Sequence, residues 1–469
     1  MINVIFLTSI ITQEIYYLVC GVLAVLVLAG IFFMSKVKTA VLGNRLSAIA
    51  MIFGIILVIV RYEYLLKWVL YASLVVGTII GLIFAKKIKM IEMPQMVALL
   101  NGVGGAASGI VAIFAFLEIG ADKSVFTTTT SLVAILVGFV TLFGSLVAAG
   151  KLHKVLPQKP VVLKNHQLIS IILLVLMGAM IPLGVICSDF AIFFLIGAIV
   201  FSTLFGIAFT IRVGGADMPI TISLLNSLSG VAGAIAGLAI GDVLLVAVGG
   251  IVGASGLLLT QIMCRAMNRQ LIDILLGKTT VSSTSASQVN VPVTESIEPH
   301  NIIDPIEVLK NAKRVIIVPG YGMAIAQAQH LVKQLADKLI GQGAVVKYAV
   351  HPVAGRMPGH MNVLLCEANV EYEDLYELDD INPEFKDSDV TIVVGANDVI
   401  NPAARMAEGT PIYGMPILNV DECSHIIIFN FDLKPGYAGV PNPIYTRTHG
   451  VSLQLGDAAK TIANILSKL

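Results

Sequence analysis

An acid, a proline and an asparagine recur at the same spacing at two places in the chain. The stretches EMPQMVALLN (92–101) and DMPITISLLN (217–226) share Met, Pro, Leu, Leu and Asn in register. Each stretch opens a long apolar run, and its proline fits the first turn of a helix, where a missing N–H costs nothing. Seven further residues at 1.5 Å each place Asn101 and Asn226 about 10 Å into their helices.

A carboxamide at this depth in a membrane needs a hydrogen-bond partner or water. Polar residues inside spans often mark ion pathways, so Asn101 and Asn226 are candidates for a shared hydrated path. They can instead form interhelical hydrogen bonds worth about 0.6 to 2 kcal/mol, and both interpretations stay open. Small residues follow each asparagine: Gly102, Gly104, Gly105, Ala106 and Ala107 in one copy, and Ser227, Ser229, Gly230, Ala232 and Gly233 in the other. They allow close helix approach between parallel repeats.

Two charged residues lie near this helix pair. Asp217 is part of GGADMP, and Arg269 ends MCRAMNR. Both are candidates for the same path. The structural alternatives are a helix N-cap for the aspartate and an interfacial anchor for the arginine.

A second stretch whose residues could bind a ligand is VIIVPGYGMAIAQAQ (315–329). An apolar strand leads into Gly320-Tyr321-Gly322 and then a helix, which lets backbone amides meet a pyrophosphate. Ile325 takes the place of a third glycine, so the motif alone is weak. Gly- and Pro-rich loops also follow other strands, as GANDVINPAA (395–404) and KPGYAGVPNP (434–443). Such loops are also common for turn reasons, but at strand ends they favour dinucleotide binding.

The composition indicates that a large part of the chain lies in a membrane. Hydrophobic residues make up 57% of the 469 residues, charged residues 13%, and the mean hydropathy is +0.89. These values are typical of a membrane protein. Lys and Arg balance Asp and Glu at 30 each, which predicts no nucleic-acid partner. The five cysteines lack metal-site spacing, so we expect no bound metal.

Apolar runs long enough to cross a bilayer are expected near 14–34, 46–60, 64–84, 94–117, 127–150, 167–187, 189–211, 219–240 and 242–264. Lys and Arg cluster in alternate connections, which predicts an N-terminus outside and a cytosolic C-terminal part. We therefore expect about nine transmembrane helices in a domain over 1–275. A Ser- and Thr-rich linker over 276–300 follows.

After the linker the pattern changes to alternating strands and helices. Strands are expected at 315–320, 344–352, 390–398 and 425–430, and a helix is expected within 324–343. This alternation over 301–469 predicts an α/β Rossmann-like domain with a doubly wound parallel sheet. No acid closes the second strand and Arg356 follows it, a combination that favours a 2′-phosphate.

Several stretches together resemble one family. GYGMAIAQAQ, HPVAGRMPGHMNVLL, GANDVINPAA, IYGMPILNVDE, PGYAGVPNP, GGADMP, LLNSLSG and MCRAMNR look like the beta subunit of the proton-translocating NAD(P) transhydrogenase. The resemblance implies a bacterial cytoplasmic-membrane enzyme that couples inward proton movement to hydride transfer from NADH to NADP⁺. It also implies NADP(H) on this chain, NAD(H) on an alpha subunit, and a two-fold symmetric complex containing a second beta subunit.

The resemblance also implies cofactor-binding residues. It places Gly320, Tyr321, Gly322, Met323, Ala324 and Ile325 at the pyrophosphate, and Val353, Ala354, Gly355, Arg356, Met357 and Pro358 at the phosphate region. Gly395, Ala396, Asn397, Asp398 and Val399 fall near the nicotinamide ribose, and Lys434, Pro435, Gly436, Tyr437, Ala438 and Gly439 form a lid. Gly414, Met415, Asp457 and Ala458 line the adenosine side. Hydride passes directly between nicotinamide rings, so no side chain is expected to act as acid or base.

Two positions depart from the family. Many members have a titratable histidine where Asn101 stands, and an asparagine cannot take that role. Either water chains lined by Asn101 and Asn226 carry the proton, or a titratable residue lies on another helix, of this chain or of the alpha subunit. Many also have Lys-Arg where this chain has Asn430-Phe431, so we expect Lys434 to reach the 2′-phosphate instead. An alternative function from the spans and glycine motif alone is an ion transporter whose cytosolic domain senses a nucleotide.

Overall fold

The computed structural model describes most of the chain. The described residues are 12–34, 37–61, 68–88, 92–117, 124–157, 160–187, 190–214, 217–266, 270–271, 304–355, 359–408, 410, 412–436, 438–447 and 449–469. Five of the predicted site residues or segments lie outside them, namely Arg269, Arg356, Met357 with Pro358, Tyr437 and the linker 276–300.

The chain divides into two compact units. One comprises Met1–Leu156, Val162–Ile211 and Ile222–Leu258, and the other comprises Pro157–Val161, Arg212–Thr221 and Leu259–Leu469. The first unit is helical, and the second contains the sheet. The domain boundaries expected at 275 and 300 fall among undescribed residues and stay a prediction.

Nine helices in the described residues are long and apolar enough to cross a membrane. They are α2 (Gln13–Met34), α3 (Val37–Arg61), α4 (Trp68–Lys87), α5 (Met93–Leu117), α6 (Val125–Leu152), α7 (His166–Ile186), α8 (Ala191–Ile211), α9 (Met218–Ile240) and α10 (Val243–Ala266). All nine predicted spans are thereby confirmed. Helix α3 begins nine residues before the predicted 46, because the charged residues in its first turns end the hydropathy signal without ending the helix.

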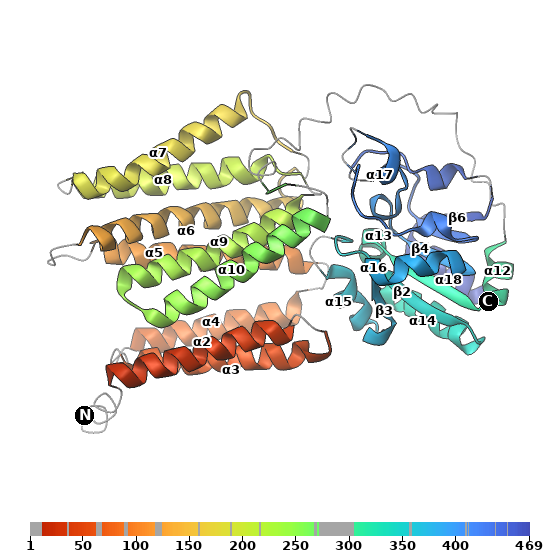
Figure 1. Cartoon of the computed structure of the whole chain (residues 1–469), viewed down its shortest axis with the longest axis horizontal. Coiled ribbons are helices and arrows are strands. Elements are labelled where there is room, and N and C mark those ends of the chain that lie inside the picture. The colour runs from red at the N-terminus through yellow and green to blue at the C-terminus, as the bar shows by residue number, and fades with distance from the viewer. Residues whose placement is uncertain are drawn as a thin grey trace. The chain divides into compact units, whose positions relative to one another are not determined.

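The repeated motif forms two matching helix pairs, α5 with α6 and α9 with α10 (Figure 1). A Cβ on Gly105 would lie 2.8 Å from the carbonyl O of Gly138, and one on Gly230 would lie 2.5 Å from the N of Gly253. Each of these glycines comes four residues after the motif asparagine. Only a residue without a side chain permits this backbone contact, so the repeat extends from sequence to packing.

The second unit contains a six-stranded parallel sheet. Its order is β3-β2-β1-β4-β5-β6. The strands are β1 (Arg314–Pro319), β2 (Val345–Val350), β3 (Leu375–Glu377), β4 (Val390–Val394), β5 (Ile426–Asn430) and β6 (Val451–Leu455). This order, with its reversal between β1 and β4, confirms the predicted Rossmann-like fold.

Strands β3 and β6 were not predicted from the sequence. Strand β3 has three residues, and both strands lie at an edge of the sheet. An edge strand has one strand neighbour, so its sequence has less need of the long apolar run that marks β1, β4 and β5.

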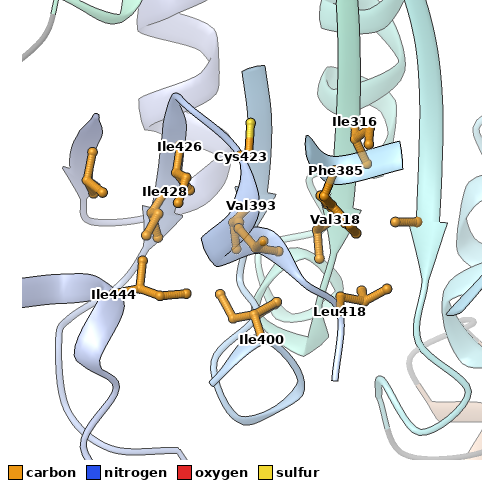
Figure 2. Packing of buried hydrophobic residues seen from close by; sticks show 14 of the residues in the cluster. Ile316, Val318, Phe385, Val393, Ile400, Leu418, Cys423, Ile426, Ile428 and Ile444 are labelled. Carbon is orange, nitrogen blue, oxygen red and sulfur yellow. The ribbon is translucent and has the colours of Figure 1, made fainter. Parts of the chain in front are cut away.

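One face of the sheet is covered by short segments instead of long helices. Ile316, Val318, Val393, Ile426 and Ile428 pack there against residues from these segments (Figure 2). The segments include η6 (Asn382–Asp387), η8 (Val420–Glu422) and η9 (Pro443–Thr446). The opposite face carries α14 (Gln329–Gly341) against β2 and α18 (Ala458–Lys468) against β5 and β6. Burial on both faces explains the continuous apolar runs of the central strands.

The helix expected within 324–343 is interrupted. The structure has a single turn, α13 (Tyr321–Ile325), and then α14, which starts at Gln329. Gln327 between them has φ 51°. The N–H of Ala328 donates to the O of Met323 at 3.0 Å, and the N–H of Gln327 donates to the O of Ala324 at 3.3 Å. This pair of bonds ends a helix. The predicted helix is therefore confirmed from Gln329 to Gly341, and the prediction was wrong only in its first residues.

His351 joins two loops at the end of β2. Its side chain is 1% exposed. Its Nδ1 accepts from the N–H of Val353 at 3.2 Å, so Nε2 carries the proton and donates to the O of Pro416 at 2.8 Å. Burial lowers the pKa of His351 to about 4. The folded protein therefore holds this imidazole neutral.

A depressed histidine pKa makes folding sensitive to acid. The unfolded chain protonates His351 below about pH 6.5, while the folded chain resists until about pH 4, so stability is lost between these values. Between about pH 7 and about pH 4.5 we expect wild-type 301–469 to lose roughly 2 kcal/mol more unfolding free energy than His351→Gln. Urea unfolding followed by circular dichroism measures this difference. The same pH dependence in both proteins would contradict it.

Candidate functional site

The turns that follow β1 and β4 touch each other through glycine backbones. The N–H of Gly322 donates to the O of Gly395 at 2.8 Å, and the N–H of Gly320 donates to the O of Val394 at 2.8 Å. A Cβ on Gly322 would lie 2.6 Å from the Cα of Gly395. Gly395 itself has φ 68°, a conformation that favours glycine. The sequence thus brings two glycine turns together where the strand order reverses, which is where open α/β sheets bind ligands.

The loop after β4 holds the predicted lid in place. The side-chain amide of Asn397 donates to the O of Lys434 at 3.0 Å, and the Oδ2 of Asp398 accepts from the N–H of Ala438 at 3.1 Å. A Cβ on Gly436 would lie 2.5 Å from the Oδ1 of Asp398. The predicted ribose loop and the predicted lid are therefore one hydrogen-bonded unit.

Two further asparagines in this unit were not predicted as site residues. Asn442 donates to the Oδ1 of Asn397 at 3.2 Å, and Asn401 donates to the O of Pro441 at 3.2 Å. Asn401 is fully buried, and Asn442 nearly so. Both lie in stretches that the sequence marks as Gly- or Pro-rich loops, but which backbone group each amide meets depends on the fold.

Asn430 supports this unit from the last position of β5. Its side-chain amide donates to the O of Ala396 at 3.1 Å and to the hydroxyl of Tyr445 at 2.8 Å. The side chain is buried. With both donor bonds directed into the protein, Asn430 positions the loop that begins at Gly395.

The neighbours of Asn430 face solvent. Phe431 is 78% exposed, and the Lys434 side chain is 82% exposed. The Nζ of Lys434 lies 3.4 Å from the Oδ2 of Asp432, and the backbone N–H of Lys434 donates to the Oδ1 of Asp432 at 3.1 Å. An exposed pair of this kind contributes little stability, so Lys434 is available to another anion.

The remaining predicted cofactor residues lie at other strand ends. Val353, Ala354 and Gly355 follow β2, and Gly355 has φ 107° with its Cα beside the His360 ring. Met415 and Gly414 lie in the loop that ends at Pro416, the hydrogen-bond partner of His351. Ala354 is buried, and Val399 packs against the core of the sheet. His351, which sequence reasoning missed, therefore connects the two loops.

Asp457 and Ala458 begin α18 after β6. The Oδ1 of Asp457 accepts from the N–H of Lys460 at 3.2 Å, as an N-cap residue does. Ala458 is buried. The structure accounts for both residues as a helix start.

The residues at these strand ends fit a dinucleotide. Gly320, Gly322 and Gly395 let the β1 and β4 turns pack backbone against backbone at the switch point, where open α/β sheets bind ligands. Lys434 adds a cation that faces solvent. The glycine turns and this lysine together suit a ligand that contains phosphate.

In the helical unit, Asn101 lies inside the protein. It is 8% exposed, and its amide points at the O of Ile222 on α9 at 3.4 Å. Asn226 is half-buried. One turn beyond Asn101, a Cβ on Gly104 would lie 2.6 Å from the Oγ of Ser229. The α5 and α9 copies of the motif thus face each other along small and polar residues.

Two buried hydroxyls lie beside this helix pair. Ser145 of α6 approaches Gly102, the residue after Asn101, and Thr210 of α8 approaches Gly144 of α6. Both are fully buried, and within the described residues neither hydroxyl has a hydrogen-bond partner in the protein. Buried hydroxyls are normally bonded to protein or water. Sequence reasoning missed both, because a serine or threonine within an apolar run is usually satisfied by its own helix.

A buried carboxylate precedes α9. Asp217 directly precedes α9 and is buried, with its backbone O accepting from the N–H of Thr221 at 3.2 Å. This contact agrees with a helix start, and the role of Asp217 in a path stays a prediction.

Among the described residues, no group of three or more His, Cys, Asp or Glu is arranged to hold a metal ion.

Comparison with known proteins agrees with this architecture over almost the whole chain. The family model described as NAD(P) transhydrogenase beta subunit matches residues 13–468. A protein named NAD(P) transhydrogenase subunit beta from Rhodospirillum rubrum is 38% identical over 461 residues, which cover 97% of this chain and 98% of the relative. A second protein of that name, from a strain of the same species, gives the same values. The nine apolar helices and the six-stranded sheet thus belong to one known arrangement, and the chain is a member of the NAD(P) transhydrogenase beta subunit family.

Proposed function

We propose that this chain couples inward proton movement through its helices to hydride transfer from NADH to NADP⁺, with NADP(H) bound by its own sheet domain. The observation that carries the proposal is the glycine contact between the β1 and β4 turns, in a chain whose described residues also include nine apolar helices. A dinucleotide site and a membrane part on one polypeptide are what such coupling requires. NAD(H) is bound by an alpha subunit.

The residues of the sheet domain bind and orient the cofactor. The turn from Gly320 to Ile325 approaches the pyrophosphate, and the unit from Gly395 to Val399 holds the nicotinamide end beneath the lid from Lys434 to Gly439. When bound, the nicotinamide supplies the hydride chemistry. In hydride transfer this chain contributes proximity and orientation, and none of its side chains acts as acid or base in that step.

The proton path runs between α5 and α9. Asn101 and Asn226 cannot titrate, so they carry protons by holding water in hydrogen bonds. Ser145 and Thr210 extend this polar region toward the end where Asp217 lies. Arg269 is also assigned to the path, on the sequence alone. The two hydroxyls support this proposal because they are fully buried and, within the part of the chain that the structure describes, have no hydrogen-bond partner in the protein.

The functional assembly contains partner subunits. We propose a two-fold complex of two such chains with alpha subunits in a bacterial cytoplasmic membrane. The N-terminus lies outside, and the sheet domain (301–469) lies in the cytosol on a linker over 276–300. The transmembrane domain occupies residues 1–275.

Two assays test this function. Residues 301–469 mixed with a separately purified NAD(H)-binding domain should exchange hydride between NADPH and an NAD analogue without any membrane. Vesicles that contain this chain and its alpha subunit should also move protons during the reaction. Ion movement without nucleotide oxidation would overturn the proposal and identify a nucleotide-sensing transporter.

The glycine contact predicts a loss of cofactor binding in Gly322→Ala. The added Cβ must displace the Gly395 turn, because it would lie 2.6 Å from the Cα of Gly395. We expect NADPH to bind about tenfold or more weakly, since about 1.4 kcal/mol corresponds to a factor of ten. The control is Gly341→Ala at the end of α14, where no atom lies within 4 Å of the new Cβ. Isothermal titration calorimetry on both variants measures the difference.

Lys434→Ala should weaken NADPH binding about tenfold, because one charge-assisted hydrogen bond to phosphate is lost. NADH binding, which lacks that phosphate, should not change. Lys386→Ala is the matched control, since Lys386 is also an exposed lysine, 3.9 Å from Glu422. An unchanged NADPH affinity in Lys434→Ala would refute this role.

Ser145→Ala should slow proton movement in the complete complex by about tenfold, because a water chain loses one of its ligands. Hydride exchange by the sheet domain should continue. Ser202→Ala on α8 is the control, because its hydroxyl is equally buried but donates to the O of Ala198 at 2.6 Å. Proton uptake into vesicles is the measurement. Equal rates for the two variants would exclude Ser145 from the path.

A further inference from the structure

Three helices bring polar groups together at Asp242. Asp242 lies between the end of α9 and the start of α10 and is 6% exposed. The hydroxyl of Tyr16, in the first turns of α2, donates to its Oδ2 at 3.3 Å. The guanidinium of Arg61, the last residue of α3, lies 5.8 Å from the centre of the Tyr16 ring. The chain positions that meet here are 226 residues apart.

The position of Asp242 is set by packing of the helices around it. Tyr16, Cys20 and Leu23 of α2 form a buried cluster with Ala50 and Leu57 of α3, and Leu244 and Val248 of α10 pack against it. On the other side, a Cβ on Gly237 of α9 would lie 3.1 Å from the backbone O of Asp242. The carboxylate is therefore held between α2 and the α9–α10 turn.

Buried carboxylates are few in this helical region. Among its described residues, Asp217 and Asp242 are the buried acids, and they lie just before the start and just after the end of α9. Helix α9 has 23 residues, which correspond to about 35 Å. One acid thus lies at each end of a helix long enough to cross the hydrocarbon layer.

Small and polar residues connect Asp242 with the predicted path. From Asn101 onward, Gly104 faces Ser229, and Ser108 faces Gly233, where a Cβ would lie 3.7 Å from its Oγ. Gly237 is one turn further along α9 and touches the Asp242 backbone. The contact between α5 and α9 therefore extends to Ser108 and Gly233, and one turn later α9 reaches the residue that touches Asp242.

Capping of α10 accounts for the contact of only one of the two carboxylate oxygens of Asp242. The Oδ1 of Asp242 accepts from the N–H of Leu245 at 2.8 Å and so caps α10. An N-cap requires no second partner, and asparagine or serine would cap equally well. The Oδ2 is instead held by a phenol from another helix at 3.3 Å, a long and weak bond.

We propose that Asp242 is a proton-binding residue of the translocation path, at the end of the bundle opposite to Asp217. The inference rests on the proposed function. A proton from water on that side binds Oδ2, which turns the group from an acceptor into a donor, and the same proton later leaves along the α5–α9 contact. Oδ1 keeps its bond to Leu245 throughout, so the helix start is preserved in both states.

Titratable and charged side chains of α2 and α3 lie near Asp242. The titratable or charged residues facing Asp242 among the described residues are Tyr16 and Cys20 of α2, with Arg61 of α3 across the Tyr16 ring. Arg61 also donates to the Oε1 of Gln13 at 2.8 Å. The phenol accepts a hydrogen bond once Oδ2 is protonated, because a hydroxyl can both donate and accept.

Asp242→Asn separates proton binding from helix capping. Asparagine is a good N-cap residue but cannot ionise. In vesicles that contain the whole chain and its alpha subunit, we expect this variant to lose about tenfold or more of its proton movement. NADPH binding by the same complex should be unchanged. Asp242→Glu, which keeps the acid, should retain proton movement with a shifted pH profile, and Tyr16→Phe should shift that profile without abolishing the reaction.

The outcomes distinguish a failure of the role proposed for Asp242 from a failure of the proposed function. Proton movement in Asp242→Asn equal to wild type would overturn the proposal, since capping would then be the whole role of Asp242. A loss shared by Asp242→Asn and Asp242→Glu, with poor assembly on size-exclusion chromatography, would also overturn it. A wild-type complex that moves no protons would instead refute the proposed function.

Discussion

Contact between backbones at glycine is the constraint on which both parts of this chain depend. In the sheet domain, Gly322 touches Gly395 where the strand order reverses. In the helical region, Gly105 touches Gly138, and Gly230 touches Gly253. A single Cβ at any of these places would occupy space already filled by main chain. The glycines therefore fix how closely the β1 and β4 turns and the paired helices approach.

Polar groups follow from this close packing. In the membrane part, close helices exclude bulky apolar side chains, so Asn101, Ser145 and Thr210 lie inside the bundle with small neighbours. In the sheet domain, the glycine turns leave backbone uncovered, and asparagines hold the loops around it. Asn397, Asn430 and Asn442 all direct their amides at backbone or side-chain oxygens of this unit. Such amides order loops without adding charge beside a phosphate.

Several charged side chains lie away from these glycine contacts, while Asp398 lies within the loop unit that begins at Gly395. Lys434 and Asp432 pair in solvent, and the carboxylates of Asp217 and Asp242 lie just beyond the two ends of α9. The centre of the bundle thus contains neutral amides and hydroxyls, while ionisable groups stand at its ends. This distribution avoids the high cost of a charge in the middle of a membrane.

The amino-acid sequence by itself determined the nine spans, the parallel sheet and the glycine turn after β1. Hydropathy over twenty residues and turn chemistry over six are local properties, so they can be read without a fold. The broken helix at Gln327 and the edge strands β3 and β6 could not be predicted from local sequence, because strand pairing and packing determine them. Only the tertiary structure could show that Tyr16 meets Asp242 across 226 residues, or that Ser145 lies beside Gly102. Such meetings depend on which helix faces which, and long-range packing sets that choice.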